Sequence, residues 1–243
     1  DTILLAEESN NRFIAKYDSD YNLVWANRIT STSGSVNNQV ITDANNSIYV
    51  AQSFRDTITA NGTNYLALGT LDLVILKYDT NGNFIWLAQA GCDNYMDISN
   101  IDIDVNGDVY VTGEIEGNVT LGSSTLSVST SSSYLAKCNS NGVWNWAIEV
   151  VASVYSYPYD VVVDGSSVYF VGEMEGSITI GTETFIVPST SDSHSFIAKY
   201  DTTGVFQWAE ELTTTNSLSI YGLTTDDNND LIITGYMYGT SVI

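Results

Sequence analysis

The feature that most constrains this chain is a motif that recurs at a nearly fixed interval. Each copy contains one lysine and ends on a tryptophan, and the copies are 61, 60 and 62 residues apart. The chain contains 243 residues and no lysine outside these copies. Such an interval indicates a chain built from one repeated structural unit. The copies are FIAKYDSDYNLVW (13–25), VILKYDTNGNFIW (74–86), YLAKCNSNGVWNW (134–146) and FIAKYDTTGVFQW (196–208), with Lys16, Lys77, Lys137, Lys199, Trp25, Trp86, Trp146 and Trp208.

A second motif follows the same interval and so supports the same repeat. It includes ITDANNSIYVAQ, IDVNGDVYVTG, VVDGSSVYFVG and TTDDNNDLIITG. Its aspartates are Asp43, Asp104, Asp164 and Asp226, again 61, 60 and 62 residues apart. Because two separate motifs share one interval, the repeat covers nearly the whole chain.

Each repeat has the pattern of two strand–turn–strand units. In the copy with Lys137, the stretches 101–104 and 108–113 flank one tight turn, and 133–138 and 143–150 flank another. Asp, Asn and Gly at these turns favour hairpins. A smaller outer hairpin is expected at 117–126. Four antiparallel strands in about 60 residues are typical of a β-propeller blade, and the absence of a helical apolar period excludes a helical solenoid.

The phase of the repeat divides one blade between the two ends of the chain. We expect a single domain over 1–243 in which the first and last segments complete one blade and close a ring of four. In that alignment Ile243 matches Ile180, and Thr2 and Ile3 match Thr184 and Phe185. The alternative is that these periods form part of a larger propeller or repeat array. The expected segments are 1–31 (outer half of the shared blade), 38–91, 98–151, 157–212 and 217–243 (inner half of the shared blade).

The repeat resembles a known family. FIAKYDTTGVFQW together with DVNGDVYVTG is similar to the SBBP-type β-propeller repeat, and the second half also resembles the strands of NHL-type propellers. The resemblance implies a noncatalytic binding or spacer module outside the cell, with no conserved active site. Members of the SBBP family often have seven blades, so a ring of four departs from the family pattern.

The charge excludes some partners. The chain has 29 acidic and 7 basic residues, a formal net charge of −22. Such a surface repels nucleic-acid phosphates and anionic membranes, and no stretch reaches the roughly 18 apolar residues of a membrane helix. Cys92 and Cys138 stand where other repeats have different residues, so we interpret them as free structural thiols.

The repeated lysines and tryptophans are interpreted as structural residues. A catalytic lysine is not expected once per blade, whereas a half-buried ammonium that finds an anionic or carbonyl partner would recur with the fold. The tryptophans occupy a fixed position on the outermost strand, so blade packing is favoured over sugar binding.

The acidic turns offer one candidate metal site. Asp102, Asp104, Asn106 and Asp108 alternate in DIDVNGD, as at the start of an EF-hand loop, and calcium prefers such oxygen ligands. Gly113 stands where the closing glutamate should be, and ordinary turn chemistry is the competing interpretation.

The opposite face offers a candidate partner site. We expect its tyrosines to lie in the connections before the innermost strands, where they could contact a ligand or cover loop backbone. The only histidine, His194, is expected in a loop, which argues against an ordinary zinc site or a Ser-His-Asp enzyme. The candidate tyrosines are Tyr95, Tyr155, Tyr157, Tyr159 and Tyr221.

The sequence thus predicts a noncatalytic structural or recognition module that binds a protein or glycan, located outside the cell or on a cell or virion surface. One alternative is a calcium-stabilised subunit that binds copies of itself in a surface filament or layer. Others are a glycan-binding propeller lectin and a hydrolase or lyase acting at the ring centre. No cofactor other than Ca²⁺, no nucleic acid and no membrane insertion are expected.

Overall fold

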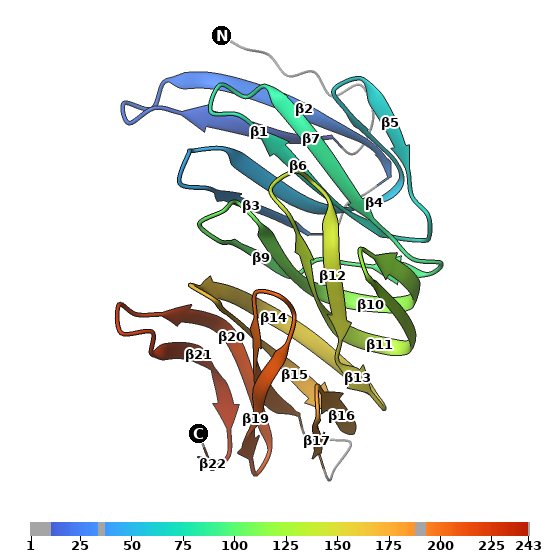
Figure 1. Cartoon of the computed structure of the whole chain (residues 1–243), viewed down its shortest axis with the longest axis vertical. Helices are drawn as coiled ribbons and strands as arrows, with labels where there is room; N and C mark the ends of the chain where they lie inside the picture. Colours follow the sequence, from blue (N-terminus) through green and yellow to red (C-terminus); the bar gives the residue numbers. More distant parts are fainter. Residues whose placement is uncertain (1–10, 34–36, 188–192, 243) are drawn as a thin grey trace.

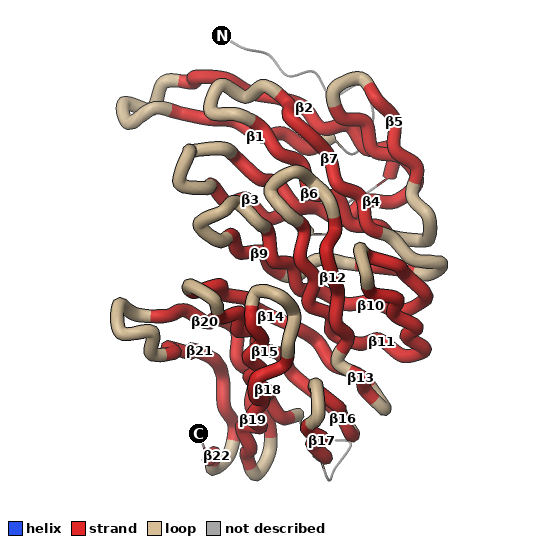
Figure 2. Tube along the Cα trace, viewed as in Figure 1, coloured by secondary structure: helices blue, strands red, loops and turns tan. Residues whose placement is uncertain are grey.

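The computed structural model describes residues 11–33, 37–187 and 193–242. Figure 2 shows strands joined by loops, with no helix in these ranges. The all-β prediction is therefore confirmed. The strand-rich composition explains it, because Val, Ile, Thr and Tyr pack well on pleated surfaces.

Three whole repeats each form four main antiparallel strands. In every one, the second strand pairs with both the first and the third, and the third also pairs with the fourth. The predicted blade pattern is confirmed. The strands are β3 (Asn38–Thr42), β4 (Ile48–Ala60), β6 (Asp72–Tyr78) and β7 (Phe84–Ala90) in the first; β9 (Asn100–Ile103), β10 (Val109–Leu121), β11 (Ser124–Cys138) and β12 (Trp144–Glu149) in the second; and β14 (Tyr155–Asp164), β15 (Ser167–Glu175), β18 (His194–Asp201) and β19 (Phe206–Thr214) in the third.

Short outer strands extend the blades and link neighbouring ones. The outer half of β4 pairs with β5 and also with β2, which belongs to the preceding hairpin. In the same way, β13 pairs with β16, and β22 pairs with β19. The expected outer hairpin at 117–126 is formed by the ends of β10 and β11. The short strands are β5 (Thr63–Leu66), β8 (Tyr95–Met96), β13 (Val151–Ala152), β16 (Ser177–Ile180), β17 (Glu183–Ile186) and β22 (Ser241–Val242).

The core lies between successive blades, so the central strands are buried on both faces. In β6, Val74 and Leu76 pack toward the preceding hairpin, whereas Leu73 and Ile75 pack toward the second repeat. All four side chains are fully buried. This is why the third strand of each repeat is a nearly continuous apolar run interrupted by its lysine.

The two ends of the chain form half-blades that do not meet. The hairpin of β1 (Arg12–Tyr17) and β2 (Leu23–Ser33) and the hairpin of β20 (Ser217–Thr225) and β21 (Leu231–Tyr238) lie at opposite ends of the stacked blades (Figure 1). Among the described strands, β1 pairs with β2 alone, and β21 with β20 alone. The expected closure into a ring of four is not formed by these residues.

The remaining part of the closure prediction involves Thr2, Ile3 and Ile243, which lie outside the described residues. The described blades instead form an open stack, as in the alternative of a larger propeller or repeat array.

Candidate functional site

The acidic turns are closed by hydrogen bonds from the backbone to one side-chain oxygen. Asp201 Oδ1 accepts the N–H groups of Thr203 (2.9 Å) and Val205 (3.0 Å), and also the Thr203 hydroxyl. The Thr203 hydroxyl, followed by these amides, lowers the pKa of Asp201. Turn chemistry therefore accounts for these carboxylates. In six other turns the backbone N–H groups two and four residues further on donate to the same kind of side-chain oxygen. The acceptors are Oδ1 of Asp18, Asp43, Asp79, Asp104, Asp226 and Asn139.

Three of the four predicted calcium ligands, Asp102, Asp104 and Asp108, have separate protein partners. Asp102 Oδ2 accepts the Val163 N–H of the next repeat (2.7 Å), and Asp104 Oδ1 accepts two backbone N–H groups of its own turn. Asp108 Oδ2 lies 2.9 Å from Lys137 Nζ. Within the described ranges, no group of three or more His, Cys, Asp or Glu side chains could hold a metal ion. The geometry gives the predicted calcium site no support.

The repeated lysine lies in a row of side chains that crosses each blade. Lys137 pairs in register with Tyr110 on one side and Trp146 on the other. Its ammonium is 5.1 Å from the Tyr110 ring centroid, and it donates to the Thr202 carbonyl of the next blade (3.3 Å). Burial alone would lower the pKa of Lys137, but the Tyr110 hydroxyl and the Asp108 carboxylate raise it. The ammonium therefore stays charged and has a structural role.

The other lysines have related partners. Lys16 donates to the carbonyl and hydroxyl oxygens of Thr80 in the next blade, both at 3.1 Å. Lys77 Nζ lies 3.9 Å from Asp43 Oδ2. Lys199 lies over the Tyr169 ring, 5.0 Å from its centroid. Lys16, Lys77 and Lys137 thus each lie near an anionic or carbonyl partner. Lys77, Lys137 and Lys199 also lie over a tyrosine ring, a contact that the sequence did not reveal.

Each of the first three repeated tryptophans covers a glycine in the turn of the following blade. A β-carbon added to Gly82 would lie 2.6 Å from the Trp25 ring, and one added to Gly142 would lie 2.9 Å from the Trp86 ring. Trp86 Nε1 also donates to the Ser140 carbonyl of that turn (3.1 Å). These contacts lie between blades, where the sequence predicted the tryptophans to pack.

The candidate tyrosines lie in strands rather than in the connections, so the loop prediction is wrong. Tyr95 opens β8, Tyr221 lies in β20, and Tyr155, Tyr157 and Tyr159 alternate along β14. The first strand of the third repeat is longer than its pattern suggested, because β14 pairs with β15 as far back as Tyr155. Strand alternation brings Tyr155 and Tyr157 to one side of β14, and a bulge at Tyr159 leaves its ring on the same side, against Tyr157.

Four of the tyrosines form a continuous group, here called the tyrosine cluster: Tyr155, Tyr157, Tyr159 and Tyr221. The ring centroids of Tyr157 and Tyr159 are 5.1 Å apart, and those of Tyr159 and Tyr221 are 5.0 Å apart, both edge to face. Tyr155, Tyr157 and Tyr159 are half-buried, whereas Tyr221 keeps 54% of its surface exposed. Edge-to-face contacts of this kind hold aromatic rings in fixed orientations.

Glu173 holds the tyrosine cluster in place through hydrogen bonds. Its carboxylate accepts hydrogen bonds from the hydroxyls of Tyr155 (3.2 Å), Tyr159 (2.9 Å) and Ser219 (2.8 Å). Burial, and then the charge of Glu173, raise the pKa of Tyr155 and Tyr159, so both hydroxyls remain donors at neutral pH. Ser219 comes from β20, so this carboxylate ties the last hairpin to the third repeat.

Tyr95 lies beside the equivalent carboxylate of the second repeat. Burial raises the pKa of Tyr95, and Glu114 raises it further. Burial likewise raises the pKa of Glu114, which accepts a hydrogen bond from Ser131. Glu114 and Glu173 were not predicted as site residues. Both directly follow the glycine that ends the second repeated motif, and this shared position is the sequence signal that could have identified them.

His194 also departs from its predicted loop position. It is the first residue of β18 and is buried, with Nδ1 2.5 Å from Glu211 Oε1. In the described part of the chain, no helix is long and apolar enough to cross a membrane. Cys92 and Cys138 are buried and free, as predicted.

Comparison with known proteins supports the blade assignment. No protein-family model matches the chain. An uncharacterized WD repeat-containing protein of Acanthamoeba polyphaga mimivirus is 26% identical over an alignment of 243 positions. The alignment covers 92% of this chain and 14% of the viral protein. WD repeats form four-stranded propeller blades, as the whole repeats do here. The chain is a repeat protein of the β-propeller type. This propeller spans only a small part of the length of the viral relative.

Proposed function

We propose that this propeller is a noncatalytic recognition module that binds a protein partner through the tyrosine cluster. The observation that carries the proposal is the arrangement of four tyrosines whose rings are held by one another and by Glu173. Rigid aromatic side chains lose little conformational entropy on binding, and tyrosine is enriched among residues that dominate binding energy. Similarity to a WD repeat protein favours protein interaction over catalysis.

Charge favours a basic segment of the partner. The chain carries a net charge of −22, and Glu173 and Glu175 lie on the strand that pairs with β14. All three arginines belong to the first hairpin and β4, far along the stack from the cluster. An arginine or lysine of the partner would be attracted by the negative charge of the carboxylates and would also make cation–π contacts with the tyrosine rings.

The assignment to SBBP-type repeats and the location outside the cell or on a surface are part of the same proposal. The resemblance to SBBP-type repeats supports a module that works outside the cell or on a cell or virion surface. In that setting the cluster would recognise a basic protein segment, and a sugar bound by ring stacking would be the competing ligand.

Selection from a random peptide library tests this proposal. Immobilised wild-type protein should enrich peptides rich in Lys and Arg, and Tyr221→Ala should weaken their binding about tenfold. Tyr21→Ala is the matched control, because Tyr21 is 83% exposed in the first hairpin. Equal binding to wild type and Tyr221→Ala would contradict the proposal. Binding on a glycan array, with no enriched peptide, would replace it with the lectin alternative.

A further inference from the structure

Two adjacent whole repeats carry the same pair of glutamates. In both, the pair follows the glycine that ends the second repeated motif, in the pattern Glu-x-Glu. A tyrosine pairs in register with the second glutamate of each, Tyr95 with Glu116 and Tyr155 with Glu175. The two sets are therefore equivalent, and each is here called a tyrosine–glutamate site. The second-repeat site consists of Tyr95, Glu114 and Glu116, and the third-repeat site consists of Tyr155, Glu173 and Glu175.

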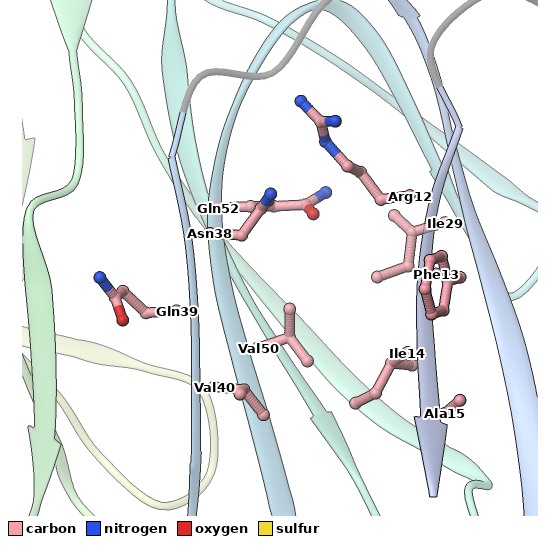
Figure 3. Close-up of a pocket in the computed structure, with 10 residues that line it drawn as sticks. All are labelled: Arg12, Phe13, Ile14, Ala15, Ile29, Asn38, Gln39, Val40, Val50 and Gln52. Atoms are coloured by element: carbon pink, nitrogen blue, oxygen red, sulfur yellow. The ribbon is translucent and has the colours of Figure 1, made fainter.

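Folding of the blade does not require these glutamates. The first repeat has Ser53 and Arg55 at their positions and Gln52 at the position of the glycine. The Gln52 side chain extends from β4 toward β1 (Figure 3), yet this repeat forms the same four main strands. A residue that the blade needs recurs in every copy, as the lysine and the tryptophan do. The glutamate pairs therefore indicate a role other than folding.

The carboxylates of the two sites are not neutralised by a cation of the described chain. The ion pairs between described residues use Asp43, Asp108 and Glu211 instead. All four glutamates are half-buried. Burial raises the pKa of Glu114, and the nearby charge of Asp97 raises it further. A cationic ligand would offset the cost of holding these charges partly away from water.

The second-repeat site also has unused hydrogen-bonding capacity. Ser133 lies opposite Glu114 in register, so the two side chains are on the same side of the sheet. The Ser133 hydroxyl is buried and has no hydrogen-bond partner among the described residues. In the third repeat the equivalent Ser195 hydroxyl donates to the Leu218 carbonyl (2.8 Å). A buried hydroxyl without a partner carries a free-energy cost, which indicates that this site is completed by a ligand.

Tyr157 joins the two sites. Its ring contacts Tyr159 within the tyrosine cluster of the third repeat. Burial raises the pKa of Tyr157, Ser99 lowers it, and the charges of Glu114 and Asp97 raise it further. The Tyr157 hydroxyl therefore lies near the second-repeat carboxylates while its ring belongs to the third repeat. The two sites form one continuous surface.

The packing of the blades sets the distance between the sites. The apolar core lies between successive blades, so their sheets stack face to face. Stacked sheets lie about 10 Å apart, and equivalent residues of neighbouring blades are separated by a similar distance. A polyproline II segment has three residues per turn and rises about 3.1 Å per residue, so positions three apart lie on one side of it, about 9 Å from each other. Grooves lined with aromatic side chains bind such segments.

We propose that the two tyrosine–glutamate sites together bind one segment of the partner, in polyproline II conformation, that carries arginine or lysine at two positions three residues apart. One cation lies at Tyr95 and Glu114, and the other lies at Tyr155 and Glu173. Each cation contacts an aromatic ring and a carboxylate. The inference rests on the proposed function and specifies the spacing of the partner's charges.

Titration calorimetry with three proline-rich peptides tests this spacing. The first peptide carries two arginines three positions apart, the second carries two adjacent arginines, and the third carries one arginine. The first should bind about fivefold more tightly than the second, although both have the same charge and composition. Glu114→Gln should remove this advantage. It should change the affinity of the second and third peptides by no more than about twofold, because the third-repeat site remains.

Glu183→Gln is the matched control. It removes the same charge from an exposed residue of the outer strand β17, and it should keep the advantage of the first peptide. Glutamine at position 114 keeps an acceptor oxygen for the Ser131 hydroxyl, so Glu114→Gln should fold, which circular dichroism would verify.

The outcomes separate this inference from the proposed function. Equal affinity of wild type for the two dibasic peptides, or an advantage that survives Glu114→Gln, would overturn the two-site inference. If both dibasic peptides nevertheless bind and Tyr221→Ala weakens them, the proposed function stands. If no arginine peptide binds wild type, the inference and the proposed function are both overturned.

Discussion

The Trp86 ring covers Gly142 of the following blade so closely that a β-carbon on Gly142 would lie 2.9 Å from it. Gly142 also has a φ of 79°, a conformation that favours glycine. The indole N–H of Trp86 donates to the carbonyl of Ser140 in the same turn. One contact therefore fixes both the distance between two blades and the shape of the turn. It explains why tryptophan and glycine recur together.

Gly142→Ala should destabilise the protein by about 2–4 kcal/mol, because the methyl group meets the Trp86 ring and the backbone is strained. Gly62→Ala is the matched control. Gly62 has a similar φ of 76°, with no atom within 4 Å of an added β-carbon. This control should lose only about 1 kcal/mol, the cost of the backbone conformation. Urea unfolding of both variants would measure the difference, and equal losses would refute the packing role of tryptophan.

Lys137→Met should cost about 1–2 kcal/mol, because Asp108 then loses its charged partner while remaining mostly buried. The side chains of Lys137 and Asp108 are only 13% and 17% exposed. Lys16→Met should cost less than about 0.5 kcal/mol, since the bonds of Lys16 to Thr80 lie at an exposed site. Thermal unfolding compares the two, and a larger loss for Lys16→Met would contradict this ranking of the lysines.

Asp201→Asn should make stability less sensitive to acid. The pKa of Asp201 is lowered in the folded state, so its stabilising effect is complete above the ordinary carboxylate pKa, near 4, and is lost as the pH falls through the lowered value. The asparagine keeps the Oδ1 acceptor without titrating, as Asn139 does in the second repeat. Melting temperatures between about pH 5 and pH 2 should fall less steeply for the variant.

The reverse substitution provides the control for this pH effect. Asn139→Asp should fold normally at neutral pH and add acid sensitivity, because Asp201 shows that an aspartate can make the same turn bonds. Parallel pH profiles for Asn139→Asp and wild type would show that the turn carboxylates do not control acid stability.

Removal of calcium should leave the melting temperature unchanged. Both carboxylate oxygens of Asp102 and Oδ1 of Asp104 already accept backbone amides, Asp104 Oδ2 accepts the Tyr110 hydroxyl, and Asp108 is paired with Lys137. Comparison of EDTA-treated protein with protein in calcium at equal ionic strength would test this, since general screening of the negative charge is then the same in both samples. A specific rise in melting temperature with calcium would restore the predicted site.

Local features of the fold could be predicted from the sequence because they recur in each repeat. The lysine and tryptophan motifs located β1, β6, β11 and β18, and the Asp-Asn-Gly turns located the hairpins. Alternation along these strands also indicated that the lysine would be half-buried and would need a partner. These features follow from a local residue pattern, which four copies of the motif specify redundantly.

The relation between the two ends could not be predicted in the same way. Closure of a ring depends on the angle between successive blades, and no single repeat records that angle. The strand position of Tyr155 was also missed, because its pairing with Glu175 extends β14 beyond the recurring motif. The carboxylate that holds the tyrosine cluster comes from β15 and contacts Ser219 of β20, across a blade boundary that the motif does not describe.

The central claim is that each of the first three repeated tryptophans packs on a glycine of the next blade, and proton NMR tests it most directly. Ring currents shift protons that lie over an aromatic face. The α-proton resonances of Gly82, Gly142 and Gly204 should therefore lie upfield of those of Gly62 and Gly165, which have no atom within 4 Å of an added β-carbon. The Gly142 shift should vanish in Trp86→Leu. Unshifted resonances for all three glycines, or a Gly142 shift that survives this substitution, would contradict the account.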